Sequence, residues 1–204
     1  MSGSARLVGA TADKARKYLK QVTDVLDRKG VIYCLDGGTL LGIAREGRLL
    51  PWDDDMDLFV PASEVDKLRK CILPLWLSGL RVRTEAFESV CGPAKPGDLR
   101  VVKFRNRKRL ISRGEILLDI FVKYADEAFY HWSVGKGEGQ TVNKKVPRHF
   151  YDNLATLEFD GKTYPVPADL DGYLTCRYGD WRTPVEAWNY RQDDLAAVSA
   201  DQQR

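Results

Sequence analysis

The chain has 204 residues, of which 44% are hydrophobic and 30% charged, and its formal net charge at pH 7 is +3. This composition is typical of a globular protein with one substantial core. The small net charge gives no reason to expect nucleic acid as a partner, although local basic patches can still hold phosphate. The N-terminus lacks the apolar region of a signal peptide, and no apolar run approaches membrane-spanning length. We therefore expect a cytoplasmic protein with no integral membrane segment.

The four cysteines are widely spaced and form no Cys-x-x-Cys pair, and both histidines lie far from them in sequence. Zinc sites normally use paired ligands at short spacing, so this pattern disfavours zinc. Buried free thiols in a reducing compartment are the better interpretation of Cys34, Cys71, Cys91 and Cys176.

The first predicted elements serve packing. Ala15, Leu19, Val22 and Leu26 recur at helical spacing, which predicts an amphipathic helix over residues 11–29, ended by Gly30. A short apolar run over residues 31–35 then predicts a buried strand.

Two glycines follow this strand. At Gly37 and Gly38 the backbone can take a positive φ and approach a ligand without a Cβ in the way. Thr39 is predicted to cap a short helix through Arg45. The free N–H groups and the dipole at such a helix start favour an anion, so we expect phosphate binding here.

An acidic run, residues 53–57, comes next and leads into a strand that ends at Val60. On a strand, Asp55 and Asp57 point to the same face. Two adjacent carboxylates repel each other unless a cation lies between them, and Mg²⁺ (or Mn²⁺) suits such a pair when substrate phosphates complete its shell. A phosphate cradle beside a metal site indicates phosphoryl or nucleotidyl transfer.

Two other interpretations of the acidic run were weighed. A solvated acidic loop is disfavoured because the run is enclosed between Pro51-Trp52 and a hydrophobic strand. An EF-hand calcium loop would use Asp53, Asp55 and Asp57 as its first ligands and Glu64 as its last. Its sixth position, however, is Leu58 instead of the glycine that the turn needs.

The middle of the chain alternates helix and strand. A helix is predicted from Ser63 and is kinked or ended by Pro74, followed by strands over residues 80–84 and 100–105 and a loop over residues 91–98. A basic cluster overlaps the second strand. It is either a solvated edge or a contact for a diphosphate or an anionic acceptor, and it comprises Lys103, Arg105, Arg107, Lys108 and Arg109.

Residues 116–124 form an almost unbroken apolar run, which predicts a central strand. Asp119 interrupts it. A carboxylate in such a place is costly unless it is paired or binds a metal, so Asp119 is either a salt-bridged structural residue or part of the site.

The C-terminal part is predicted to hold a loop over residues 132–145, a hairpin turning at Asp160-Gly161, and a helix from Asp169 to Tyr178 that ends at Gly179. From about residue 191 the chain is polar and expected to fray. We therefore expect a single domain over residues 1–190, with residues 150–185 as an appended subdomain and residues 191–204 as a polar tail.

Two blocks of sequence resemble one family, the LicD/fukutin-related branch of the nucleotidyltransferase superfamily. The first block comprises Asp36-Gly37-Gly38-Thr39-Leu40-Leu41-Gly42, Arg45, Gly47 and Pro51-Trp52-Asp53-Asp54-Asp55-Met56-Asp57. The second comprises Tyr173-Leu174 and Tyr178-Gly179-Asp180-Trp181-Arg182-Thr183-Pro184. Tyr178 and Trp181 are interpreted as core packing more readily than as substrate contacts. Asp119 matches the third carboxylate that this superfamily requires.

This resemblance implies an α/β (α+β) nucleotidyltransferase fold, with a small mixed, twisted sheet flanked by helices. It implies that Asp55, Asp57 and Asp119 are the catalytic and metal-binding residues, with two Mg²⁺ ions. Donor phosphates would lie at Gly37, Gly38 and Thr39, and Arg45 and Arg48 are weaker candidates for steadying charge in the transition state.

The resemblance also implies a reaction, in which a phospho-alcohol moves from a CDP-linked donor such as CDP-choline or CDP-ribitol to an acceptor hydroxyl with release of CMP. The acceptor would be a glycan, a glycolipid or a small metabolite. One alternative is a nucleotidyltransferase that moves NMP from an NTP to a small molecule or protein. Another, disfavoured because all three carboxylates are present, is a non-catalytic module that binds a cation or a nucleotide.

Overall fold

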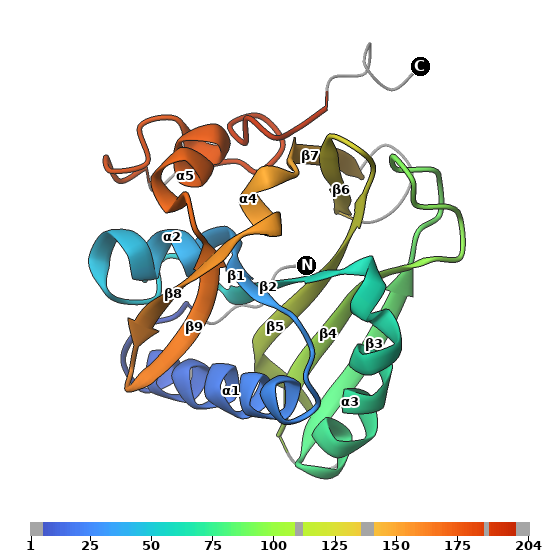
Figure 1. Ribbon diagram of the computed structural model, residues 1–204. Helices are drawn as coiled ribbons and strands as arrows, with labels where there is room; N and C mark the ends of the chain where they lie inside the picture. Colours follow the sequence, from blue (N-terminus) through green and yellow to red (C-terminus); the bar gives the residue numbers. More distant parts are fainter. Residues whose placement is uncertain (1–5, 109–111, 136–140, 186–187, 199–204) are drawn as a thin grey trace.

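The computed structural model describes residues 6–108, 112–135, 141–185 and 188–198 (Figure 1). The helices in these residues are α1 (Gly9–Arg28), α2 (Gly37–Glu46), α3 (Val65–Leu77), α4 (His149–Asp152) and α5 (Leu170–Tyr178), with a short 3-10 helix η1 (Ala62–Glu64) before α3. The strands are β1 (Cys34–Asp36), β2 (Asp55–Pro61), β3 (Leu80–Ala86), β4 (Leu99–Lys108), β5 (Ser112–Ala125), β6 (Phe129–Val134), β7 (Val142–Pro147), β8 (Leu154–Phe159) and β9 (Lys162–Pro167).

A mixed sheet organises the molecule. Its main strand order is β1-β2-β5-β4-β3, with β6 pairing with the end of β5 and β7 with β6. The β2–β5 pair is parallel and the other pairs are antiparallel. The predicted mixed sheet flanked by helices is therefore confirmed, and β5 has the central place expected of its apolar sequence.

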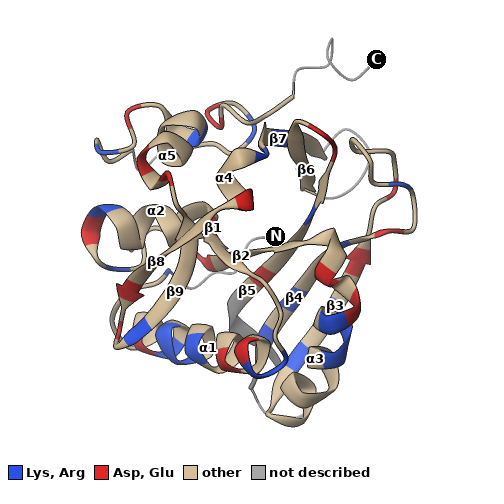
Figure 2. Ribbon diagram, in the orientation of Figure 1, with Lys and Arg blue, Asp and Glu red and all other residues tan. Residues whose placement is uncertain are grey.

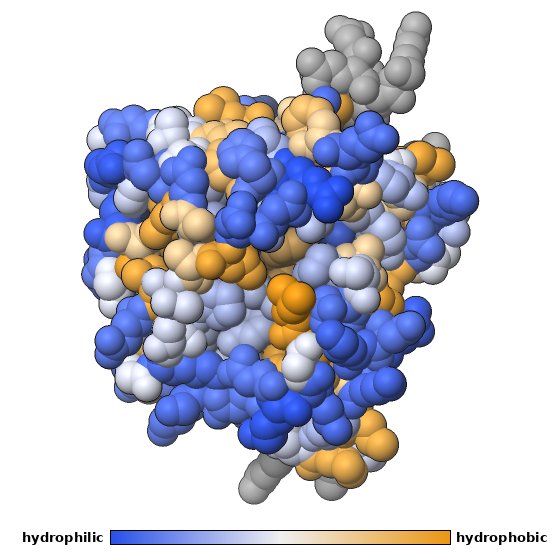
Figure 3. All heavy atoms as spheres, viewed as in Figure 1, coloured by the Kyte–Doolittle hydropathy of each residue, from blue (hydrophilic) through white to orange (hydrophobic). Residues whose placement is uncertain are grey.

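Helices α1 and α3 cover one face of this sheet (Figure 1). From α1, Leu19, Val22 and Leu26 are fully buried, and from β5 Leu118 and Ile120 enter the same core. Hydrophilic side chains dominate the surface over α1, whereas α3 also exposes Leu73, Trp76 and Leu77 near its C-terminal end (Figure 3). No helix in the described residues is both long and apolar enough to cross a membrane.

The ends of the early elements differ slightly from their predicted bounds. The first strand starts at Cys34 instead of Val31, because the backbone N–H of Val31 still bonds the carbonyl of Leu26 at the end of α1. Ser63, the predicted start of the next helix, lies in the 3-10 helix η1, and α3 itself begins at Val65 with no side-chain cap. Pro74 lies inside α3, which continues to Leu77.

The predicted loop over residues 132–145 is wrong for its described residues, where strands β6 and β7 lie, and residues 136–140 are outside the described part of the chain. Trp132 and Val146 are buried, and so is Lys144, whose ammonium is paired with Asp194. A buried lysine makes β7 look like a solvated segment in the sequence. By contrast, the β8–β9 hairpin and α5 match their predictions, including positive φ at Asp160 and Gly161 in the turn.

The predicted fraying from residue 191 is also wrong for the described part of that segment. Residues 194–198 lie against β7, where Lys145 N–H donates to Ala196 and Val198 N–H donates to Asn143. Asp194 is buried. The division into a domain of residues 1–190 with an appended subdomain stays a prediction.

Candidate active site

One cavity of about 510 Å³ opens between the uncovered face of the sheet and the C-terminal segments. One wall comes from the start of α2 and from β2, β5 and β4. The other comes from β6, β7, α5 and residues 180–185 and 188–190. The cavity is lined by all the aspartates of the acidic run and by the aspartate of β5, namely Asp53, Asp54, Asp55, Asp57 and Asp119.

A row of charged residues crosses the sheet at the cavity. In the strand register, Asp36 on β1 lies opposite Asp57 on β2, and Asp57 lies opposite Asp119 on β5. Lys103 on β4 lies opposite Asp119, and Arg83 on β3 lies opposite Lys103. Residues opposite each other on neighbouring strands project to the same face, so three carboxylates meet two cations along one row.

Asp55 lies two residues before Asp57 on β2 and shares its face. Burial raises the pKa of both carboxyls well above the ordinary value, and the neighbouring carboxylates raise it further. The pKa of Asp53 rises to about 6, again chiefly through burial. Without a cation, these carboxyls therefore resist full ionisation near neutral pH.

Asp119 is fully enclosed and only partly satisfied. The Nζ of Lys103 donates a hydrogen bond to Oδ2 of Asp119, whereas Oδ1 is buried with no hydrogen-bond partner among the described residues. Burial raises the pKa of this carboxyl, and Lys103 and Arg105 only partly counter it. An orphaned buried carboxylate oxygen is costly unless something binds it.

The acidic residues fit a hard divalent cation, which prefers carboxylate oxygens. Oxygen atoms of Asp53, Asp54 and Asp55 lie within 4.8 Å of one another. The expected ligands were Asp55, Asp57 and Asp119, so this close group shares only Asp55 with them. Asp57 and Asp119 lie opposite each other on the neighbouring strands β2 and β5. Asp53 and Asp54 therefore belong to the candidate metal centre as well.

Gly37 and Gly38 line the cavity, and phosphate binding at this turn stays a prediction. Helix α2 starts at Gly37, and Thr39 is buried with its hydroxyl accepting the Asp57 N–H at 2.9 Å, so Thr39 is not the cap. A Cβ on Gly37 would lie 2.1 Å from Oδ2 of Asp57, and one on Gly38 would lie 2.1 Å from Oδ2 of Asp53. The glycines thus admit two carboxylates to the positive end of α2.

The two candidate arginines, Arg45 and Arg48, differ in their position relative to the cavity. Arg45 lines the cavity, donates to the Trp181 carbonyl at 3.2 Å, pairs with Glu46 and lies 5.8 Å from the ring centroid of Trp52. Arg48 is mostly exposed, pairs with the other oxygen of Glu46 and does not line the cavity. The structure therefore does not support Arg48 as a site residue.

The wall opposite the carboxylates is aromatic. Tyr178 and Trp181, which the sequence favoured as packing residues, both line the cavity while also touching the core. The rings of Tyr178 and Trp188 have centroids 5.2 Å apart. Trp132 and Tyr190 complete this wall, which offers flat apolar surface to part of a ligand.

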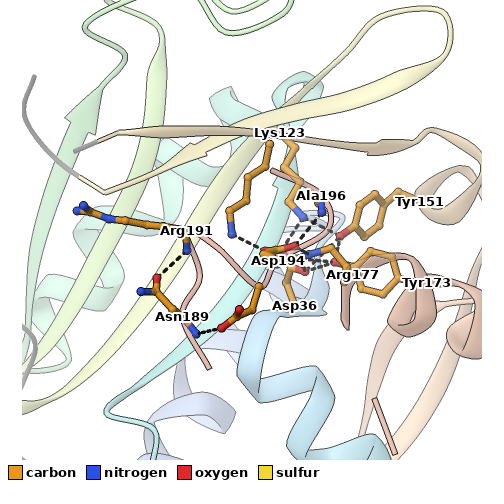
Figure 4. Close-up of polar contacts among 11 residues, drawn as sticks. Asp36, Lys123, Tyr151, Tyr173, Arg177, Asn189, Arg191, Asp194 and Ala196 are labelled. Carbon is orange, nitrogen blue, oxygen red and sulfur yellow. Dashed lines mark hydrogen bonds and ion pairs between the residues drawn. The ribbon is translucent and has the colours of Figure 1, made fainter. Parts of the chain in front are cut away.

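A buried ion-pair cluster that the sequence did not predict reaches the cavity lining through Asp36, Lys144 and Arg177 (Figure 4). Lys123 lies 2.5 Å from Oδ2 of Asp36, and Arg177 reaches Oδ1 of Asp36 at 3.2 Å. Arg177 also binds both oxygens of Asp194, at 2.9 and 2.6 Å, and Lys144 pairs with Asp194. The hydroxyls of Tyr151 and Tyr173 join the same cluster.

The carboxylates of this cluster are strongly ionised. Burial opposes their charge, but Lys123 and Arg177 outweigh it at Asp36 and lower its pKa. Arg177 and Lys144 lower the pKa of Asp194 to about 2. Burial lowers the pKa of Lys123 to about 8. A signal for this cluster existed in the sequence, because Lys123 is a second charge in the apolar run that contains Asp119.

Comparison with known proteins places this site in a family. Residues 30–169 match the family described as "LicD/FKTN/FKRP, nucleotidyltransferase domain". The human protein named Ribitol 5-phosphate transferase FKRP is 28% identical over 166 residues, which are 80% of this chain and 31% of that protein. The human protein named Ribitol-5-phosphate transferase FKTN is 24% identical over 181 residues, 87% of this chain and 35% of that protein.

The chain thus spans about a third of the length of these curated relatives. Among solved structures, a crystal structure of ANT(2")-Ia in complex with adenylyl-2"-tobramycin is 16% identical and covers 85% of this chain and 80% of that chain. Its TM-score is 0.43, a likeness too low to carry an argument.

Proposed function

The chain belongs to the LicD/FKTN/FKRP nucleotidyltransferase-domain family, and we propose that it is a cation-dependent transferase of phospho-alcohol groups. The donor in this proposal is a CDP-linked alcohol of the choline or ribitol kind. The acceptor is a hydroxyl of a glycan, a glycolipid or a small metabolite, and CMP is released. The relatives FKRP and FKTN are named as ribitol-phosphate transferases, which supports the phospho-alcohol class.

The observation that carries the proposal is the pair Asp57 and Asp119, adjacent on parallel strands in a cavity where the pKa of each carboxyl is raised. Such a pair is unfavourable in the free protein and becomes favourable when a cation binds. Perturbed carboxylates that share a cavity with an aromatic wall are typical of a catalytic site.

Each part of the cavity then has a role. Asp55, Asp57 and Asp119 would hold Mg²⁺ or Mn²⁺, with Asp53 and Asp54 beside them. The bound cation would supply charge neutralisation at the phosphates and a lower pKa for the attacking hydroxyl. Lys103 fixes Oδ2 of Asp119, which leaves Oδ1 as the atom that binds the cation or receives the acceptor proton.

The remaining walls bind and orient the donor. Arg45 is held against Trp181 and Trp52, where its charge can meet a phosphate oxygen. The aromatic wall of Tyr178, Trp181 and Trp188 can stack a base or cover the apolar edge of an alcohol. The carboxylates near Gly37 and Gly38 mean that donor phosphates reach the start of α2 only with a cation present.

The test is release of CMP from a panel of CDP-alcohols in the presence of Mg²⁺, with and without candidate acceptors. Asp55→Ala and Asp119→Ala should each abolish release. Asp160→Asn is the control, since it removes one carboxylate far from the cavity, at an exposed hairpin turn where asparagine tolerates the positive φ. It should behave like the natural chain.

The outcomes separate the proposed activity from its alternative. CMP release from one donor that both alanine variants lose supports the proposal. Pyrophosphate release from an NTP, with no CMP from any CDP-alcohol, would replace it with nucleotidyl transfer. Binding of Mg²⁺ without either product would indicate a non-catalytic module.

A further inference from the structure

Four cations stand together on one face of two adjacent strands, and we call them the basic ladder: Arg81 and Arg83 on β3, Lys103 and Arg105 on β4. Arg81 lies directly opposite Arg105, and Arg83 lies directly opposite Lys103. Directly opposite residues of an antiparallel pair project to the same face. The pairs therefore bring like charges together twice in succession.

The basic ladder continues the rows of the candidate active site. Lys103 lies opposite Asp119, and Arg105 lies opposite Leu117, which itself lies opposite Asp55. Basic segments of β4 lie beside the acidic segment of β5 (Figure 2). Lys103 lines the cavity, whereas the three arginines lie outside it. The ladder thus begins at the cavity wall and extends outward toward the edge strand β3.

The charges of the ladder are only partly balanced within the described residues. Lys103 is paired with Asp119, and Nε of Arg83 lies 3.4 Å from Glu85. Among the residues whose side chains the structure describes, no carboxylate lies within ion-pair distance of Arg81 or Arg105. Like charges directly opposite each other destabilise a sheet, so the pair Arg81 and Arg105 does not stabilise the folded chain. A bound anion would turn the repulsion into attraction.

We infer that the basic ladder is a subsite for a phosphate group carried by the acceptor. The inference rests on the proposed function and narrows its acceptor to phosphate-bearing polyols or glycans. Guanidinium groups suit this task because their planar N–H donors match phosphate oxygens. Strands lie about 5 Å apart, so the phosphate would sit about 5 to 10 Å from a hydroxyl placed at Asp119. That distance matches the size of a sugar or polyol.

The location assigns the ladder to the acceptor and not to the donor. The donor's phosphates belong next to the carboxylates and the cation, and its base belongs on the aromatic wall across the cavity from β4. The ladder lies outside that enclosed space. It therefore contacts a molecule that enters the cavity with one end only, which is the arrangement of an acceptor whose hydroxyl reaches Asp119.

The decisive measurement is the affinity for inorganic pyrophosphate, determined by isothermal titration calorimetry in a buffer that contains EDTA and no divalent cation. The variant is Arg81→Gln/Arg105→Gln, which removes the unpaired like charges. The control is Arg69→Gln/Lys70→Gln, which removes two exposed charges from α3 on the other face of the sheet. We expect at least about tenfold weaker binding for the ladder variant only. Equal affinity in all three proteins would overturn the inference.

Two further readouts accompany this test, and only the first depends on the proposed function. The single variant Arg81→Gln should release CMP from the donor at the natural rate when no acceptor is present, since Arg81 lies outside the cavity lining. The thermal midpoint of the ladder variant should equal or exceed that of the natural chain, and a lower midpoint would contradict the repulsive pair. Loss of binding to phosphatidylglycerol vesicles, with pyrophosphate binding unchanged, would assign the ladder to a membrane surface and overturn the inference.

Discussion

Two sets of aspartates, a few ångströms apart, behave in opposite ways. Asp36 and Asp57 are directly opposite each other on β1 and β2, yet the pKa of Asp36 is lowered and that of Asp57 is raised. Both are buried groups. The difference lies in their neighbours, because Asp36 meets Lys123 and Arg177, whereas Asp57 meets Asp53 and Asp119.

The comparison distinguishes a structural carboxylate from a functional one. At the ion-pair cluster, every charge has a partner, so ionisation stabilises the folded chain. At the cavity, the carboxylates repel one another, and their ionised forms are stabilised only when a ligand supplies positive charge. Removing a charge should therefore have opposite effects on stability in the two regions, and this is the basis of the following predictions.

The largest effect is expected for Asp57→Asn. Activity should fall about a thousandfold or more, equivalent to about 4 kcal/mol, because the amide cannot replace a carboxylate as cation ligand. The same change should raise the stability of the cation-free protein by about 1 kcal/mol, since it removes repulsion. CMP release and urea unfolding in EDTA measure the two quantities. Reduced stability without a cation would show that Asp57 is structural.

A smaller effect, on stability instead of activity, is expected for Lys123→Met. This change leaves Asp36 with one cation fewer in a buried site and should cost about 3 kcal/mol of unfolding free energy. Lys67→Met is the control, because its partly exposed pair with Glu64 contributes about 1 kcal/mol or less. Urea unfolding compares the two. A similar loss of unfolding free energy in both variants would mean that the buried cluster stabilises the fold no more than a surface ion pair does.

The sequence predicted much of the fold because its signals are local. The α1 periodicity, the Asp-Gly hairpin turn and the apolar β5 each depend on neighbouring residues, and all three are present. The β6–β7 hairpin was missed because Lys144 is buried through a partner 50 residues away. Tertiary ion pairs of this kind have no signature in one segment.

The candidate site shows the same limit. Asp55, Asp57 and Asp119 were identified from their strands, and the structure brings all three into one cavity. The close approach of Asp57 to Gly37 and of Asp53 to Gly38 was not predicted, because only the tertiary fold brings these residues together. Phosphate binding at the two glycines stays a prediction. Trp188 and Tyr190 in the far wall were not predicted as site residues, because they follow the last predicted helix and no local pattern marks them.

The smallest effect separates the two regions by pH. A carboxyl with a raised pKa still binds a proton in the folded state at a pH where the unfolded chain has lost it. Its contribution to the free energy of unfolding is therefore lost as pH rises through the folded pKa, which is about 6 for Asp53. Without a cation, stability should fall from about pH 4 to pH 7. Asp36 and Asp194, with lowered pKa values, change only below about pH 4 and add nothing in this window.

A bound cation competes with these protons, so its benefit should grow as pH rises. At a hundredfold excess over its dissociation constant, Mg²⁺ adds about 2.7 kcal/mol. The thermal midpoint, compared with and without Mg²⁺ at about pH 5 and pH 7.5, should therefore shift more at the higher pH, and Asp57→Asn should flatten the difference. An equal shift at both values would mean that Mg²⁺ binds away from the raised carboxyls and that the repulsive cluster is not its site.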